Sequence, residues 1–240
     1  MLQSDLAERT MLLNTRFASA QAHSLLEAAL LDRQFGRVAL VSSFGVEAAV
    51  LLHMVADIDP RTPVLFIDTE MLFEETLTYQ RDLSARLGLS DVRVLRADPS
   101  DVATADPRGL LHQSDPDTCC ALRKTVPLQN ALKGFDAWIS GRKRYQGGKR
   151  EALQLFEAET GTGRVKLNPL ANWTGGDMQA YMNLHDLPRH PLVARGYGSV
   201  GCAPCTVPAE GREGRWKGRE KTECGIHFEN GRMVKTGAIA

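Results

Sequence analysis

Residues 38–59, "VALVSSFGVEAAVLLHMVADID", carry the signals that decide the fold class. The short apolar run at 37–43 is typical of a strand that is buried on both faces of a sheet. From Val46 onward the apolar residues recur at helical spacing, which predicts a helix directly after the turn. The turn itself, Ser43-Phe44-Gly45, places unpaired backbone N–H groups at the positive end of a helix dipole, an arrangement that suits a phosphate group. An ordinary strand-to-helix turn rich in Ser and Gly is the simpler alternative.

The same alternation of strand and helix continues on both sides of this stretch. Further buried strands are expected at 62–68, 92–97, 137–141 and from 164, and helices at 1–36, 71–88, 119–134 and 175–187, with Pro127 kinking or delimiting the third of these helices. Such alternation predicts an α/β fold with a mostly parallel sheet and helices on both faces. We expect one domain spanning 1–240, with an irregular C-terminal tail from about 210 that is mobile and functional.

Polar residues also follow the second expected strand, in "FIDTEMLFEET". Asp68, Thr69 and Glu70 should lie at the same sheet edge as the Ser43 turn, because the carboxyl ends of parallel strands meet there. They could contact a ribose or a base. Capping of the following helix by Asp68 or Thr69 explains them equally well.

The composition excludes several classes of function. Lys plus Arg and Asp plus Glu both total 29, so no net charge draws the 240-residue chain to nucleic acid or to an anionic membrane. The N-terminus lacks a signal-peptide layout, and no apolar run is long enough to span a membrane. A cytoplasmic protein is therefore expected, in which thiols stay reduced and five cysteines indicate metal ligation or thiol chemistry.

Four of the cysteines form two pairs, Cys119-Cys120 and Cys202-Ala-Pro-Cys205. Four thiolates suit either a tetrahedral zinc ion or a four-iron cluster. Structural zinc sites favour a spacer within each pair, so the adjacent pair favours a cluster with separated iron corners. Buried cysteines that act as small hydrophobic residues are the alternative.

The fifth cysteine, Cys224, lies in a basic stretch with Arg212, Arg215 and His227. Nearby positive charge lowers the pKa of a thiol and enriches the nucleophilic thiolate, although such a run is often only a solvated face. A second basic run, "GRKRYQGGKR" at 141–150, follows an expected strand and reaches the same edge as the Ser43 turn. Only one aromatic residue interrupts it, which argues against nucleic-acid binding.

Taken together, "SSFGVE", "FIDTEMLFEET", "CCALRK", "WISGRKR", "GCAPCT", "GRW" and "KTECGIH" resemble the assimilatory adenylyl-sulfate reductases of the PAPS reductase family, from about Val38 to His227. The resemblance implies an adenine nucleotide α-hydrolase-like (PP-loop-like) fold. It also implies reduction of adenosine 5′-phosphosulfate (APS) to sulfite and AMP through an S-sulfocysteine intermediate, in sulfate assimilation and cysteine biosynthesis. Thioredoxin or a similar dithiol is the expected electron donor, and a homo-oligomer is compatible with the sequence.

The resemblance also implies roles for individual residues. A [4Fe-4S] cluster would be held by Cys119, Cys120, Cys202 and Cys205. The implied catalytic residues are Cys224 as nucleophile, Lys124 between cluster and substrate, and Arg212, Arg215 and His227 over the sulfate. The implied nucleotide-binding residues are Ser43, Phe44, Gly45, Gly141, Arg142 and Arg150, to which the sheet-edge argument adds Asp68.

Three other functions compete with this one. A reductase of the 3′-phosphorylated substrate PAPS, or of both substrates, would need an additional cationic contact. A zinc-stabilised nucleotide-binding module would lack catalysis and colour. ATP-pyrophosphatase chemistry is disfavoured because the chain lacks the Ser-Gly-Gly-x-Asp loop.

Overall fold

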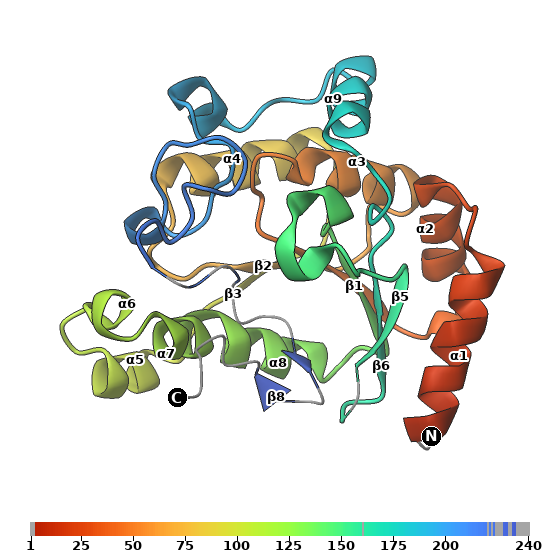
Figure 1. The fold of residues 1–240 in the computed structure, drawn as a ribbon, viewed down its shortest axis with the longest axis horizontal. Coiled ribbons are helices and arrows are strands. Elements are labelled where there is room, and N and C mark those ends of the chain that lie inside the picture. Colours follow the sequence, from red (N-terminus) through yellow and green to blue (C-terminus); the bar gives the residue numbers. More distant parts are fainter. Residues whose placement is uncertain are drawn as a thin grey trace.

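A computed structural model describes residues 3–159, 161–219, 221, 223, 228–229 and 232–233. Six described strands form one sheet in the order β3-β2-β1-β4-β6-β5 (Figure 1). Neighbouring strands are parallel except for β5 and β6, which are antiparallel. The strands are β1 (Val38–Ser42), β2 (Val64–Ile67), β3 (Val92–Leu95), β4 (Ala137–Ser140), β5 (Phe156–Glu159) and β6 (Arg164–Leu167), with a separate pair β7 (Phe228–Glu229) and β8 (Arg232–Met233).

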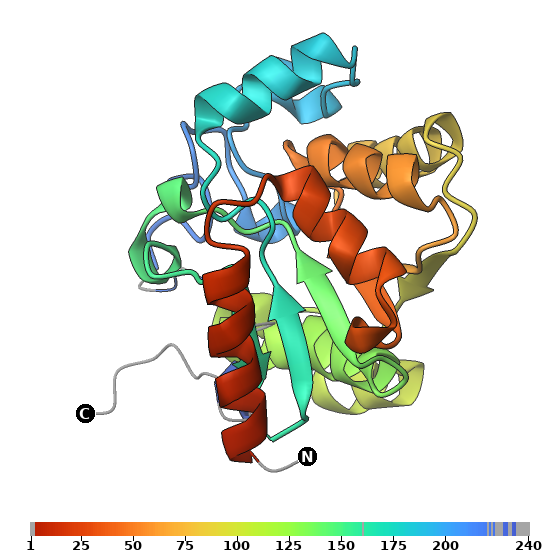
Figure 2. The ribbon, with the colours of Figure 1, turned by 90° about the vertical axis from the view of Figure 1, so that its right-hand side faces the viewer.

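Helices cover both faces of the sheet, as the two ribbon views show (Figures 1 and 2). One face carries α2, α3 and α4, the other carries α5 to α8, and α1 packs along β5 and β6. The α-helices are α1 (Gln3–Arg16), α2 (Ala22–Leu31), α3 (Ala48–Ile58), α4 (Glu74–Arg86), α5 (Pro99–Ala105), α6 (Leu111–Ser114), α7 (Pro116–Cys120), α8 (Val126–Leu132) and α9 (Gly175–Leu184). The predicted α/β class with a mostly parallel sheet is confirmed.

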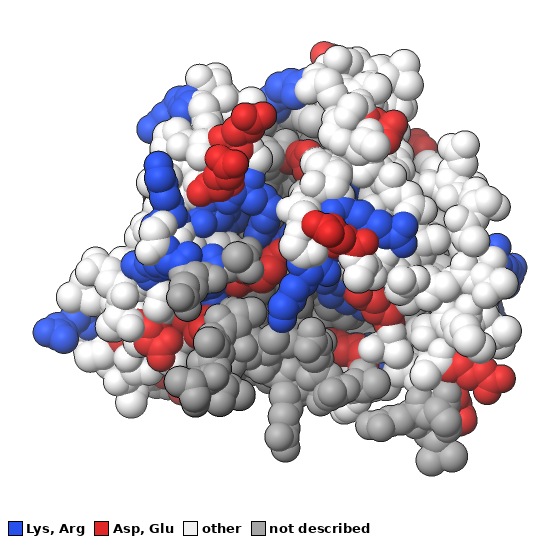
Figure 3. Space-filling model, viewed as in Figure 1, with Lys and Arg blue, Asp and Glu red and all other residues white. Residues whose placement is uncertain are grey.

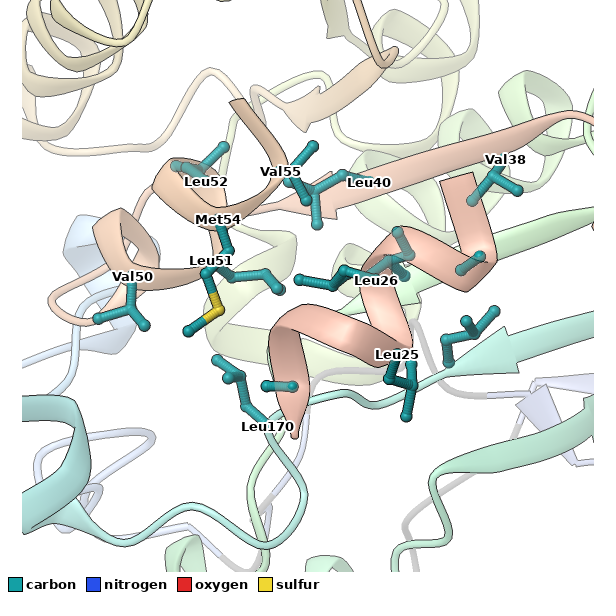
Figure 4. Close-up of a cluster of buried hydrophobic side chains, with 14 of the residues drawn as sticks. Leu25, Leu26, Val38, Leu40, Val50, Leu51, Leu52, Met54, Val55 and Leu170 are labelled. Atoms are coloured by element: carbon teal, nitrogen blue, oxygen red, sulfur yellow. The ribbon is translucent and has the colours of Figure 1, made fainter. Parts of the chain in front are cut away.

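Two hydrophobic clusters hold the layers together. The larger one joins α1 to α4 to the sheet, and Figure 4 shows Leu26 of α2 on the side that faces Leu51 of α3 and Leu40 of β1. The smaller one packs Leu128 and Leu132 of α8 against the other face. All five residues of β1 are buried, as its continuous apolar run requires. These clusters fix the strand ends on which the polar residues lie.

Three features differ from the sequence-based expectations. The expected helix 1–36 is two helices, because the chain turns at 17–21 and buries Phe17 against Phe156. The polar stretch after β3 contains α5, which begins where Asp98 accepts a hydrogen bond from the backbone of Ser100 at 2.8 Å. Strand β5 was not predicted, because two charged side chains interrupt its short sequence "FEAE".

The loop between α9 and Cys202 is held by His190, which is 1% exposed. Its Nδ1 accepts from the backbone N–H of Leu192 at 3.2 Å, so the proton of the neutral ring is on Nε2, 3.0 Å from the hydroxyl of Thr76. Burial lowers the pKa of His190 to about 4. A second proton would break the bond from Leu192, so this loop depends on a neutral imidazole.

The protein should therefore lose stability in mild acid. Between about pH 6.5 and pH 4 the unfolded His190 binds a proton that the folded residue does not, so the free energy of unfolding falls as the pH falls. The shift corresponds to about 3 kcal/mol. Urea unfolding at pH 7 and pH 4.5 measures this loss of free energy of unfolding. The loss should be smaller in His190→Gln. It should be unchanged in the control His23→Gln, which replaces an exposed histidine. If the free energy of unfolding of His190→Gln fell with pH as steeply as that of the wild type, this account would be contradicted.

Candidate active site

A cavity of about 410 Å³ lies at the carboxyl ends of β1, β2 and β4. Open α/β sheets bind their ligands at this edge. Lys and Arg side chains gather in the middle of the face seen in Figure 3. Six cationic residues line the cavity: Lys124, Arg142, Lys143, Arg150, Arg212 and Arg215. So many cations around one cavity favour an anionic ligand.

The predicted Ser43-Phe44-Gly45 turn forms one wall of this cavity. Ser43 and Gly45 line it, whereas the side chain of Phe44 is fully buried in the core, where its ring centroid lies 5.3 Å from that of Phe66 in a T-shaped arrangement. Phe44 has a φ of 47°, which turns the chain from β1 toward α3. The phenyl ring therefore anchors the turn and does not itself face the cavity.

Asp68 lies outside the cavity lining, unlike its neighbour Thr69. Its carboxylate is buried, 2.9 Å from Arg96, and accepts the backbone N–H of Glu70 at 2.9 Å. These contacts shape the loop after β2. Thr69 therefore lines the cavity, whereas Asp68 lies outside it and stabilises the loop that carries Thr69.

The basic run after β4 contributes Gly141, Arg142 and Arg150 to the lining, at the same sheet edge as the Ser43 turn. Arg142 forms an ion pair with Glu157 of β5, which also lies 3.5 Å from the ammonium of Lys166. Burial and the charge of Arg142 lower the pKa of Lys166 to about 7. Near neutral pH Lys166 is therefore only partly protonated, and the Glu157 carboxylate mainly balances the charge of Arg142, which lines the cavity.

Sequence reasoning did not single out Glu47 and Lys143 as members of the lining. Lys143 is 3% exposed, and its ammonium lies 2.8 Å from the Glu47 carboxylate. This carboxylate also accepts from Gln146 at 3.2 Å and from the hydroxyl of Tyr145. Burial raises the pKa of Glu47, but these donors outweigh it and the net pKa is lowered. The signal that could have found it is a carboxylate at the start of α3, directly after the phosphate-type turn.

A second, small cavity of about 10 Å³ is lined by Cys119, Cys120, Cys202 and Cys205. None of these four cysteines forms a disulfide with another described residue. Burial raises the pKa of Cys119 to about 11, and the neighbouring Cys202 adds to that shift. The two predicted pairs therefore meet in one place, although no three His, Cys, Asp or Glu side chains among the described residues are arranged to hold a single metal ion.

Local structure explains how the adjacent cysteines reach this cavity. Asp115 caps α7 by accepting from the backbone of Asp117 and Thr118, at 3.1 and 3.0 Å. A π-helix, Ala121–Thr125, follows α7 and joins it to α8. It accommodates Pro127 near the start of α8, so the predicted helix continues through the proline instead of ending there. Single π-helical turns within α-helices are frequently found at functional sites.

The Cys202 pair is fixed to the end of β2. The N–H of Ala203 donates to the carbonyl of Met71 at 2.7 Å, and the hydroxyl of Thr69 lies 3.2 Å from the sulfur of Cys202. Within the pair, the N–H of Cys205 donates to the carbonyl of Cys202 at 3.0 Å. Thr69 belongs to the lining of both cavities, as do Lys124 and Trp216. The anion cavity and the cysteine cavity thus share a wall.

Arg123 supports that wall from inside. Its guanidinium donates to the carbonyl of Thr69 at 3.1 Å and pairs with the buried carboxylate of Asp106 at 3.2 Å. Because Arg123 points into the protein, the next residue, Lys124, is left at the boundary of the two cavities. The role that the resemblance implies for Lys124, between cluster and substrate, stays a prediction.

Residues at 210–219 close the anion cavity on another side. Arg215 donates to the carbonyl of Val200 at 3.1 Å and lies 4.5 Å over the ring of Trp216. A Cβ at Gly201 would overlap the guanidinium of Arg215, so glycine leaves room for that cation. Arg212 lines the cavity nearby. Cys224 and His227 lie outside the described residues.

No helix in the described part of the chain is long and apolar enough to cross a membrane.

Comparison with known proteins matches residues 37–208 to the phosphoadenosine phosphosulfate reductase domain family. A protein of Mesorhizobium japonicum named adenosine 5′-phosphosulfate reductase is 48% identical over 205 residues, which are 84% of this chain and 80% of that protein. The crystal structure of phosphoadenylyl-sulfate (PAPS) reductase from Candida auris, a phosphate complex, superposes with a TM-score of 0.70 at 27% identity and covers 83% of this chain and 97% of that one.

A more distant structure, the FMN adenylyltransferase of Candida glabrata, has a TM-score of 0.56 at 18% identity and covers 87% of this chain and 74% of that one. It bears on the fold alone, and the expected adenine nucleotide α-hydrolase-like class is confirmed by the PAPS reductase structure together with the sheet described above. The cysteine pairs, the cationic cavity and the match over most of the sequence lead to one conclusion: the chain belongs to the phosphoadenosine phosphosulfate reductase family.

Proposed function

We propose that this chain reduces adenosine 5′-phosphosulfate to sulfite and AMP, with thioredoxin or a similar dithiol as electron donor. One observation carries the proposal: the anion cavity and the cysteine cavity share a wall. Thr69, Lys124 and Trp216 form this wall. A nucleotide whose phosphate is joined to sulfate is an anion that such a cavity would bind. The name of the Mesorhizobium japonicum relative favours the same substrate.

In the first half-reaction the thiolate of Cys224 attacks the sulfur of the sulfate group. A bond forms between the two sulfurs, the bond from sulfur to the phosphate oxygen breaks, and AMP leaves with that electron pair. Charge develops on the leaving phosphate, so cations already in place lower the barrier. Arg142 and Arg150 from the basic run, with the turn at Ser43, would hold the nucleotide. Lys124, Arg212, Arg215 and His227 would face the sulfate.

In the second half-reaction one thiolate of the donor attacks the sulfur of Cys224. Sulfite leaves, and the second donor thiol resolves the mixed disulfide and regenerates the Cys224 thiol. The Cys224 thiol has to face the nucleotide first and the donor afterwards. We therefore propose that the segment from about 210 moves between two positions during turnover. The reducing cytoplasm is the compartment that suits such a donor.

A [4Fe-4S] cluster on Cys119, Cys120, Cys202 and Cys205 fits the donor set, because four sulfurs line one cavity and adjacent ligands suit separated iron corners. Such a cluster would supply a structural and electrostatic centre next to Lys124. The charges of Lys124, Arg215 and Arg219 act on Cys205, so cations are available to balance thiolate ligands. We expect the oxidation state of the cluster to stay constant through one turnover, as followed by electron paramagnetic resonance.

The test is a single incubation of anaerobically purified protein with APS and no dithiol. Intact mass should rise by one SO₃ group, with one AMP released per adduct, and a dithiol added afterwards should release sulfite. A parallel incubation with PAPS identifies the substrate: an adduct formed only from PAPS would replace APS in the proposal. No adduct from either nucleotide would overturn the reaction class.

The close approach of Gly201 and Arg215 gives a second prediction. In Gly201→Ala the new methyl group should displace the guanidinium of Arg215, whose far end can move without unfolding the chain. We expect kcat for sulfite release to fall about 100-fold, as for loss of one charge-stabilising donor. Gly134→Ala, whose Cβ would meet no atom within 4 Å, is the matched control and should keep the wild-type rate. A wild-type rate in Gly201→Ala would remove Arg215 from the proposed machinery.

A further inference from the structure

Glu223, the residue before Cys224, is bound to two of the cations that line the anion cavity. Its carboxylate lies 2.5 and 2.8 Å from Nε and Nη2 of Arg150, a bidentate pair, and 3.3 Å from Nη2 of Arg212. Arg150 follows β4 and Arg212 belongs to the C-terminal part of the chain, so one carboxylate joins two sides of the cavity. Bidentate Arg–carboxylate pairs fix geometry as well as supplying energy.

This contact is shielded from solvent. The side chains of Glu223, Arg150 and Arg212 are 13%, 11% and 22% exposed. Burial raises the pKa of Glu223, but the hydrogen bond and charge of Arg150, with the charge of Arg212, lower it overall. The carboxylate is thus anionic at neutral pH, and the pair differs from the exposed ion pairs that contribute little.

A second anchor lies two residues earlier. The buried ammonium of Lys221 forms an ion pair with Asp117 of α7 and lies 5.8 Å over the ring of Trp216. Lys221 therefore binds the helix that carries Cys119 and Cys120, while Glu223 binds the cavity. The chain is therefore held at Lys221 and again at Glu223, the residue directly before Cys224. Because consecutive Cα atoms are about 3.8 Å apart, fixing Glu223 limits where the next residue can lie.

We propose that Glu223 is a positioning residue, whose carboxylate bridges Arg150 and Arg212 and thereby holds the thiol of Cys224 at the cationic cavity. This inference rests on the proposed function and adds a role for a residue next to the nucleophile. Both arginines still line the cavity while they hold Glu223, so they can contact a nucleotide and the tail together. Nucleotide binding and thiol placement then depend on the same two guanidinium groups.

The expected result concerns one half-reaction only. Glu223→Gln should slow adduct formation from APS about 10- to 100-fold in single turnover, because a reacting group misplaced by about 1 Å can cost a factor of this size. AMP should bind no more weakly than to the wild type, since both arginines remain. The release of sulfite from adduct already formed should be as fast as in the wild type or faster. Glu223→Asp, which keeps the charge, should recover part of the rate.

Glu213→Gln is the matched control, because it removes an exposed carboxylate of the same segment and should leave every rate unchanged. A wild-type rate of adduct formation in Glu223→Gln would overturn the inference. So would an equal slowing of both half-reactions, which a general loss of structure would produce. Failure of the wild-type protein to form any adduct would instead reject the proposed function, so the two failures are distinguishable.

Discussion

Replacing the sulfur of Cys224 by oxygen should abolish sulfite production. Cys224→Ser is expected to lower kcat by at least about 10⁴-fold, the scale on which enzymes lose rate when a nucleophile is removed. A serine hydroxyl is not ionised at neutral pH, and it cannot form the bond between two sulfurs that a dithiol later attacks. The measurement is sulfite release with excess dithiol, together with the intact mass after APS is added without dithiol.

The same variant should keep the features that the nucleophile does not supply. Binding of AMP should stay within about threefold of the wild-type affinity, because the cationic lining comes from other residues. Iron content and brown colour should also be retained. An adduct of one SO₃ group on Cys224→Ser would show that another residue is the acceptor and would reject the assignment.

The second large effect is expected at the four-cysteine cavity. Cys202→Ser should lose most of the bound iron and essentially all sulfite production, because an oxygen replaces a thiolate ligand on the loop that is fixed to the end of β2. Iron and acid-labile sulfide per chain, with the visible absorption spectrum, measure the first loss. A variant that retains four irons and full activity would exclude Cys202 as a ligand.

Cys202→Ser and Cys224→Ser serve as controls for each other. The same atom is exchanged in both, yet one should lose iron and the other should lose only the reaction. If the wild-type protein is colourless and contains zinc instead, the cluster is rejected and the zinc module becomes the better account. If it contains neither metal, the four cysteines act only as small packing residues and the activity must be explained by the cationic cavity alone.

The sequence predicted most where one short pattern determines both a secondary-structure element and the position of a candidate site residue. The apolar run before Ser43 predicted β1, and the turn after it was correctly placed on the cavity. The two cysteine pairs lie 82 positions apart from Cys120 to Cys202 in the sequence, yet they line one space as expected. Here the residue types alone indicated that the two pairs belong together, and the structure places three buried cysteines and the half-buried Cys205 around one space.

What escaped prediction depends on contacts between distant elements. Asp68 was expected at the cavity, but Arg96 of the next loop binds it and holds it outside. Phe44 was expected near the nucleotide, but its ring packs against Phe66 in the core. Glu223 was overlooked because nothing in its own neighbourhood indicates that Arg150 lies opposite. A pattern along the chain reveals residue types and spacing, whereas these partners come from other elements.

The π-helix after Cys120 has a consequence for how this protein can change over time. One extra residue in that turn is equivalent to a rotation of about 100° between α7 and α8, since an α-helix turns once per 3.6 residues. Deleting one residue there would leave α8 seated on the sheet but swing the cysteine pair away from Cys202. The number of residues in this segment is thus constrained as strictly as the residue types. Insertions or deletions between Cys120 and Pro127 should be tolerated less well than many substitutions.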